Sequence, residues 1–498
     1  MMIASRIAGA IVSSKTAVSS PSRPARVVRT SRGSSACDSG IAVVVALRSV
    51  RWYALYTVAT EKRKTVVRSG QLIDGNGGFL DGGVVVVLDG DRIESIGKAD
   101  AHRLPDDHLT IDAGNATLMP GMMDCHLHLN QYNTLTFKNY RAAAFEITPQ
   151  LQMLYALLHA QICMEMGFTT LRDLGGYSYA GHVTAEMCAL RDAIEFGIIA
   201  GPRLFCAGWA IITNAHLDCI LPRNIPRVAL ATADGPWELR KLTRSQLRIG
   251  ADLIKTCCSG GGGTDKEEPD IRNMTQEEID AIVDESHAFG KRTAVHCFTP
   301  EAQKMAMRAG ADTLEHSVFT DDEAVAMMKE RKIILTPTLQ HRTDHAIELR
   351  RQMGTPEFTL AKMKKIQPST KETFQRLHRA GIKMALGTDT QLDPEMGSQA
   401  GEMVIYVDFG MTPEEAIKTG TKHAAEAIGV EDRLGTLEPG KIADIIAVNG
   451  NPYADIKVLT EKKNILLVMK EGRVYVDRRP GATERLIHDA SWGWKIPI

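Results

Sequence analysis

Eight short apolar runs rich in β-forming residues alternate with helical stretches between residues 117 and 429, and this alternation restricts the fold more than any other feature. Strands that alternate with helices pair in parallel, because each helix returns the chain to the same edge of the sheet. Eight such units close into a barrel. The runs are residues 118–128, 169–173, 203–207, 252–257, 292–297, 312–316, 332–337 and 382–389. The sequence therefore predicts an α/β fold with a (β/α)8 TIM-like barrel.

Strand-like runs flank this barrel on both sides. Residues 66–72, 83–88 and 92–96 read as a β-meander with a turn at Asp89-Gly90, and further runs follow Gly435. We expect both groups to build one small β-sandwich domain into which the barrel is inserted. The expected boundaries are residues 65–116 together with 435–480 for the β-sandwich, 117–434 for the barrel, and 481–498 for a C-terminal tail.

The first 64 residues differ in composition from the rest. Residues 1–68 carry a net charge of +10 and the remaining chain carries −11, while the first 37 residues contain nine serines and no acid. Such a segment is typical of an organellar transit peptide, and it equally fits a disordered tail or a gene start placed too early. We expect this leader to be disordered or cleaved. The protein would be mitochondrial if the leader is a transit peptide and cytoplasmic if it is a gene-start artefact.

The whole chain of 498 residues is nearly neutral, with a net charge of −1, 44% hydrophobic and 24% charged residues. This balance is that of an ordinary globular protein and argues against nucleic-acid binding. No segment reaches the roughly 18 apolar residues of a membrane span. Nine cysteines show no disulfide framework.

Residues able to bind metal lie at the ends of the predicted strands. Alternation along a strand places His126 and His128 of an HxH motif on one side. The C-terminal ends of barrel strands converge on one face, where active sites of this fold lie. The six candidates are His126, His128, Lys255, His296, His316 and Asp389.

Each candidate taken alone has a structural explanation. The HxH pair could lie on the surface, a histidine after an apolar run is commonly a core residue, and Asp389 could cap a helix. Lys255 is the most informative residue, because a free ammonium is costly in a core strand. It could reach solvent or pair with a carboxylate, or it could be carboxylated by carbon dioxide and bridge two cations. The coincidence of all six at strand ends favours a metal centre.

The segment PGMMDCHLH at residues 120–128 resembles the metal-binding signature of the amidohydrolase superfamily. The strand-ordered set of six is similar to that of its binuclear subtype. Within the superfamily the chain looks most like ochratoxinase, the imidazolonepropionase-like amidohydrolases and metal-dependent Xaa-Pro-type dipeptidases. The supporting segments are LRDLGGY at 171–177, IK at 254–255 with SGG at 259–261, and GMTP at 410–413 with EAI at 415–417.

The resemblance implies a role for each candidate. His126, His128 and Asp389 would hold one divalent metal, His296 and His316 a second, and carboxylated Lys255 would bridge both. These ligands suit zinc. A hydroxide bridging the metals would attack the carbonyl of an amide, and Asp389 would be the catalytic residue that passes the proton to the leaving amine.

The expected function is hydrolysis of a C–N bond in an N-acyl or aminoacyl amino acid, as in a dipeptidase, carboxypeptidase or ochratoxinase. A lactonase, organophosphate hydrolase or cyclic amidase could use the same centre, and a non-catalytic scaffold would lack ligands that are present here. Deaminase relatives generally lack the carboxylated lysine. We expect a small amide or dipeptide substrate, no nucleic-acid or membrane partner, and a homo-oligomer.

Loop residues after the second and third predicted strands are candidate substrate contacts. They are Tyr177, His182, His216 and Asp218. Here the chain departs from its relatives, which often carry a glycine-flanked histidine where this sequence reads NAHLD at 214–218.

Overall fold

The computed structural model describes residues 63–130, 147–176, 185–215, 232–262, 265–391, 395–485 and 487. The chain divides into two units, Met1–Thr60 and Glu61–Ile498, and every described residue belongs to the second. The expected leader up to residue 62 therefore lies outside the described residues. Within the described part of the chain, no helix has the length and apolar character needed to cross a bilayer.

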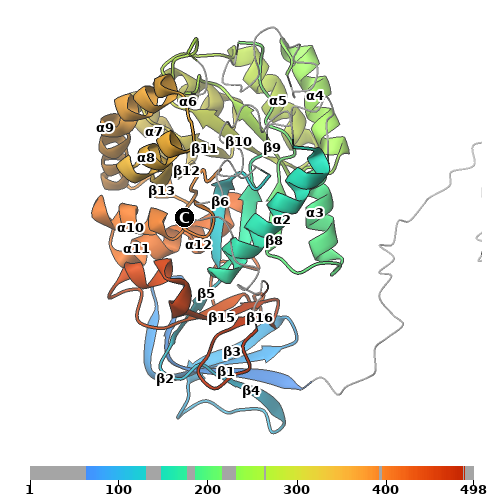
Figure 1. Ribbon diagram of the computed structural model, residues 1–498, viewed down its shortest axis with the longest axis vertical. Coiled ribbons are helices and arrows are strands. Elements are labelled where there is room, and N and C mark those ends of the chain that lie inside the picture. Colours follow the sequence, from blue (N-terminus) through green and yellow to red (C-terminus); the bar gives the residue numbers. More distant parts are fainter. Residues whose placement is uncertain are drawn as a thin grey trace, which may run out of the picture. The chain divides into compact units, whose positions relative to one another are not determined.

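Strands from both ends of the chain share one mixed sheet, drawn in blue and red in Figure 1. Its order is β16-β15-β14-β5-β1-β2-β3, and β4 pairs with β1. The strands are β1 (Lys64–Ile73), β2 (Phe79–Asp89), β3 (Arg92–Lys98), β4 (His108–Asp112), β5 (Thr117–Pro120), β14 (Ile445–Val448), β15 (Ile465–Lys470) and β16 (Arg473–Asp477). The expected hairpin at Asp89-Gly90 is confirmed, since Asp89 pairs with Arg92. A two-layer sandwich remains a prediction.

The remaining strands pair in parallel, as expected, but in two separate sheets of order β6-β7-β8 and β13-β12-β11-β10-β9. Single bridges link Leu127 to Thr390 and Ile211 to Thr256. The described residues therefore have a mixed α/β fold without one continuous barrel ladder. The strands are β6 (Met122–Leu127), β7 (Phe168–Asp173), β8 (Arg203–Cys206), β9 (Leu253–Cys257), β10 (Arg292–Cys297), β11 (Thr313–His316), β12 (Ile334–Thr336) and β13 (Lys383–Met384).

Helices separate the parallel strands along the chain. In Figure 1, helices α4 to α9 lie around β9 to β12, and α5 and α6 contact β10. Thr275 caps α5 in the capping box with Glu278 that the sequence predicts. The helices are α2 (Pro149–Glu165), α3 (Glu186–Glu195), α4 (Pro236–Arg248), α5 (Gln276–Ala288), α6 (Pro300–Ala309), α7 (Asp322–Arg331), α8 (Asp344–Gln352), α9 (Glu357–Arg379), α10 (Gly401–Asp408), α11 (Pro413–Thr419) and α12 (Lys422–Ile428), with 3-10 turns η1 (Gln340–Arg342), η3 (Ile456–Thr460) and η4 (Lys462–Asn464).

The core lies between the parallel strands and these helices. Ile254, Val295 and Leu314 of β9 to β11 are fully buried in one cluster with Ile279 and Ile282 of α5. Side chains alternate between the two faces of a strand. The residues that follow these three, Lys255, His296 and Glu315, therefore face away from the helices. This alternation points the next residues of β9 to β11 to the opposite face of their sheet.

The first and last predicted barrel strands are wrong in extent. The run 118–128 is two strands, because β5 pairs with β1 and β14 whereas β6 pairs with β7. The run 382–389 forms only the two residues of β13. Beyond them the chain turns toward β6, where Cys125 N donates to Leu386 O at 2.8 Å and His128 N to Thr390 O at 3.0 Å. A positive φ of 56° at Asp389 prevents a regular ladder there.

Gly387 permits this close approach of the chain to β6. A Cβ atom at this position would lie 2.1 Å from Thr336 Cγ2 and 2.7 Å from the His126 Cβ. We expect Gly387→Ala to lower the free energy of unfolding by about 1–3 kcal/mol, as overpacking does in other cores. Denaturant unfolding of both proteins measures the difference.

The matched control is Gly262→Ala, because a Cβ atom there has nothing within 4 Å. We expect this variant to stay within about 0.5 kcal/mol of the wild type. Equal stability of the Gly387 and Gly262 variants would contradict the packing argument.

Candidate functional site

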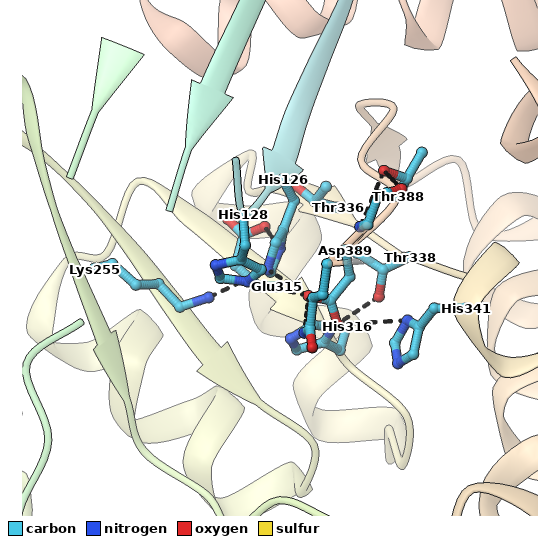
Figure 2. A network of polar contacts seen from close by, with 12 residues as sticks. His126, His128, Lys255, Glu315, His316, Thr336, Thr338, His341, Thr388 and Asp389 are labelled. Carbon is cyan, nitrogen blue, oxygen red and sulfur yellow. Dashed lines mark hydrogen bonds and ion pairs between the residues drawn. The ribbon is translucent and has the colours of Figure 1, made fainter. Parts of the chain in front are cut away.

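Two histidines and one aspartate form the closest group of possible metal ligands in the described residues. His126 lies in β6, His128 directly follows it, and Asp389 lies on the chain beyond β13 (Figure 2). One donor atom from each of the three lies within 4.8 Å of the others, and all three residues are buried. His128 Nε2 is 3.1 Å from Asp389 Oδ1, and His126 Nε2 is 3.5 Å from the same oxygen.

The other ring nitrogen of each histidine fixes the orientation of its ring. His126 Nδ1 contacts Glu315 Oε2 at 2.7 Å, and His128 Nδ1 contacts the carbonyl oxygen of Gly175. For His126, donation from Nδ1 leaves Nε2 as the acceptor nitrogen of a neutral imidazole. For His128, burial opposes the charge, but the hydrogen bond of its Nε2 with Asp389 raises the pKa of this imidazole. Both Nε2 atoms face Asp389, and a fixed Nδ1 contact of this kind is typical of histidines that bind a metal.

Glu315 is the buried anchor of this group. Its Oε1 accepts from Arg172 Nη2 at 2.9 Å and from Thr313 Oγ1 at 2.6 Å. Burial disfavours the carboxylate, but the charge of Arg172 and the contact with His126 hold the pKa of Glu315 well below its usual range. Glu315 is thus an anion that orients the ring of His126 through its Nδ1 atom.

Lys255 and His316 also lie close to His126, and His296 lies close to His316. The ring centroids of His316 and His126 are 4.8 Å apart, those of His296 and His316 are 4.6 Å apart, and Lys255 Nζ is 3.4 Å from His126 Nε2. His296 Nε2 lies 3.2 Å from the carbonyl oxygen of Gly260. Close approaches thus connect all six candidates, with His296 joined through His316, while only His126, His128 and Asp389 form a group with donor atoms within 4.8 Å of one another.

Backbone strain concentrates at this centre. His316, Ser317, Thr338 and Asp389 are four of the six described non-glycine residues with positive φ. Alternation would send His316 toward the helices, and its φ of 73° instead lets Glu315 and His316 both reach the centre. Thr338 Oγ1 then contacts His316 Nδ1 at 2.7 Å. Such strain persists only where surrounding contacts hold it, and it is common at functional sites.

Burial and charge set the protonation of these groups. Burial and the charge of Lys255 lower the pKa of His126 to about 4, so this imidazole is neutral at pH 7. Burial opposes charge on Asp389, but His341 and the hydrogen bond with His128 hold its pKa well below the usual range. Neutral imidazoles and a carboxylate are the forms that bind cations.

Asp124 links the two chain segments that carry the close group. Its Oδ1 accepts from His126 N at 2.9 Å, and its Oδ2 accepts from the Thr388 hydroxyl at 2.7 Å. Burial raises the pKa of Asp124 to about 7. Asp124 therefore fixes the segment bearing Asp389 against β6.

The sequence prediction missed several residues of this site. Glu315 and Arg172 lie inside predicted strands, and a charged residue within an apolar run, the signal that singled out Lys255, could have identified both. His341, whose Nδ1 is 3.4 Å from Asp389 Oδ2, and Thr338 follow β12 without a comparable signal. The expected substrate contacts Tyr177, His182, His216 and Asp218 lie outside the described residues.

Comparison with known proteins identifies the family. The model of the amidohydrolase family matches residues 117–475. Ochratoxinase of Aspergillus niger is 30% identical over 444 residues, which cover 83% of this chain and 87% of the relative. Imidazolonepropionase of Serratia proteamaculans is 25% identical over 402 residues, covering 75% and 88%.

Solved structures agree as well. The crystal structure of a Xaa-Pro dipeptidase with bound methionine in the active site superimposes with a TM-score of 0.73 and 32% identity, covering 83% of this chain and 99% of the dipeptidase. The family match spans more than half of the chain and includes all six candidates. The chain therefore belongs to the amidohydrolase family of hydrolytic enzymes.

Proposed function

We propose that this protein hydrolyses the amide bond of an N-acyl or aminoacyl amino acid with the help of divalent metal ions. The observation that carries the proposal is the buried group His126, His128 and Asp389, with one donor atom from each within 4.8 Å of the others. Likeness to an ochratoxinase and to a Xaa-Pro dipeptidase supports an amide substrate.

The proposal includes a closed barrel. The bridges Leu127 to Thr390 and Ile211 to Thr256 lie between the ends of the two parallel sheets. Strands β6 to β12 with the segment at β13 would then form a (β/α)8 barrel within the expected residues 117–434. Its first four residues belong instead to β5 of the mixed sheet, in which the expected β-sandwich of residues 65–116 and 435–480 would lie. Ligands at the C-terminal ends of the strands fit this arrangement.

The donor set fits two metal ions, with zinc as the first choice. His126, His128 and Asp389 would hold one ion, His296 and His316 the other, and Lys255 would bridge them after carboxylation. Lys255 is buried, and no carboxylate of the described residues forms an ion pair with its ammonium. Ions of this kind activate water and polarise a carbonyl group.

The proton transfers fall to Asp389. It is buried and anionic, and its Oδ1 faces the two β6 histidines, so it can accept the proton of the attacking water. It would return this proton to the nitrogen of the leaving amino acid. Gln391 donates to the same oxygen at 3.0 Å and holds the carboxylate in place.

Lys255→Ala tests the bridging role. We expect loss of both metal retention and turnover to background, because two cations cannot be held without the bridging anion. Metal analysis of the purified variant and a hydrolysis assay measure the two effects, and ¹³C NMR after growth with ¹³C-bicarbonate should show a carbamate signal in the wild type only.

Lys470→Ala is the matched control. Lys470 is also a buried strand lysine, and its Nζ donates to the carbonyl oxygen of Gly201 at 3.0 Å, far from the six candidates in sequence. We expect the control to keep its metal. Full activity of Lys255→Ala would overturn the binuclear proposal.

Glu315→Gln tests the support of His126. Metal affinity should fall about 10–100-fold, as it does when the hydrogen-bond partner of a ligating histidine is lost. Breaking the buried pair with Arg172 should also lower the free energy of unfolding by about 3–5 kcal/mol. Metal titration and denaturant unfolding give the two values.

Glu285→Gln separates metal affinity from general stability. Glu285 is buried on α5 and accepts from Arg244 at 2.6 Å, so it matches Glu315 in type but not in place. We expect this variant to lose some stability and no metal affinity. An equal loss of metal affinity in both variants would show that Glu315 has no specific role.

A substrate panel tests the reaction itself. We expect turnover among N-acyl amino acids, Xaa-Pro, Xaa-Arg and Xaa-Lys dipeptides and ochratoxin A, with product identification by mass spectrometry. Turnover restricted to lactones, cyclic amides or phosphotriesters would replace the proposal by one of those activities on the same centre. Sedimentation of the same preparation would test the expected homo-oligomer.

A further inference from the structure

Arg342 carries a buried positive charge that no carboxylate of the described residues contacts directly, although Asp389 and Glu402 act on it from a longer range. Its side chain is among the buried residues at 2% exposure. Nη1 lies 3.4 Å from the carbonyl oxygen of Pro337, while Nε and Nη2 have no hydrogen-bond partner among the described residues. No carboxylate of the described residues forms an ion pair with it. A desolvated guanidinium left in this state is costly, which indicates that an anion binds there.

Two other arginines of the described residues, the buried Arg172 and the partly buried Arg203, are paired. Arg172, also 2% exposed, has Glu315 at 2.9 Å. Arg203 has Asp444 at 2.8 Å. Burial lowers the pKa of Arg342 to about 10, so the guanidinium is still protonated at pH 7. Arg342 therefore differs from these two arginines in having no ion-pair partner among the described residues, and not in its charge.

The position of Arg342 relates it to the candidate active site. The guanidinium carbon lies 5.1 Å from the ring centroid of Phe298. The same ring is 4.5 Å from the ring of His296 and 5.2 Å from that of His316. The same aromatic ring thus lies near both the charge and the two histidines proposed to hold the second ion.

The backbone before Arg342 is held firmly. Glu402 of α10 accepts from Leu339 N with one oxygen and from Gln340 N with the other, each at 2.6 Å. On the opposite side, Phe298 N donates to the Ser259 hydroxyl at 2.8 Å. The backbone next to Arg342 is therefore fixed, and the guanidinium lies over the Phe298 ring, which lowers the ordering cost on binding.

We propose that Arg342 binds the free carboxylate of the amino acid that leaves during hydrolysis, so that the enzyme selects substrates with an unblocked C-terminal carboxylate. This inference rests on the proposed amide hydrolysis. In an N-acyl amino acid, the α-carboxylate is the charged group next to the scissile nitrogen. A planar guanidinium binds a carboxylate through two parallel hydrogen bonds, which Nε and Nη2 are available to make.

The test compares N-acetyl-L-phenylalanine with its C-terminal carboxamide, in full-length metal-loaded wild type and Arg342→Met. Hydrolysis gives kcat/KM, and calorimetry gives Kd. We expect the wild type to prefer the free acid, and Arg342→Met to lose about 10–100-fold on the acid and nothing on the carboxamide. Arg342→Lys should fall between the two, because lysine retains the charge without the planar fork.

The controls separate recognition from folding. Arg342→Met should keep the wild-type Tm without ligand, since methionine replaces an unpaired charge with a similar length of apolar chain. Arg308 is an exposed arginine on α6, and Arg308→Met should change neither kcat/KM nor Kd for either compound. Equal losses on the acid and the carboxamide, a large drop in Tm, or no loss at all would overturn the inference. If the wild type hydrolyses neither compound, the proposed hydrolysis of N-acyl amino acids is wrong. The ratio of the Kd values for the acid and the carboxamide, in wild type and Arg342→Met, then still decides the role of Arg342.

Discussion

The buried carboxylate of Glu315 is the interaction on which the candidate site depends. It joins Arg172 of β7, His126 of β6 and Thr313 of β11 through contacts of 2.6–2.9 Å. Removal of two opposite charges from water is costly, so this pair is maintained only with nearly complete hydrogen bonding. The same contacts tie three strands from separate parts of the chain together and turn the acceptor nitrogen of His126 toward Asp389.

The positive backbone φ angles and the close approach of Gly387 to β6 also position the candidate ligands. The positive φ at His316 and Asp389 interrupts the regular strand pattern and brings their side chains to the centre. Gly387 lets the chain pass directly above β6, and Asp124 fixes it there through Thr388. These features reduce the stability of an isolated strand, and the surrounding parallel strands supply the contacts that offset this cost.

Sequence reasoning located the metal candidates because each lies at the end of a β-rich apolar run, and strand ends of an α/β fold share one face. It also identified Lys255, since charge in such a run is conspicuous. It did not separate β5 from β6, because both belong to one apolar run and only the pairing partners differ. His341 and Arg342 were not identified from the sequence, because both follow β12 in a polar segment without a periodic pattern.

The sequence by itself determined the order of strands and helices, the identity of the six candidate ligands and the amidohydrolase resemblance, because these depend on local periodicity and on residue type. The tertiary structure alone decided which groups orient the ligands. The contacts of Glu315 with His126, of Thr338 with His316 and of Glu402 with the turn before Arg342 join residues 22 to 189 positions apart. Such contacts depend on how distant segments pack against each other, and local sequence patterns therefore cannot predict them.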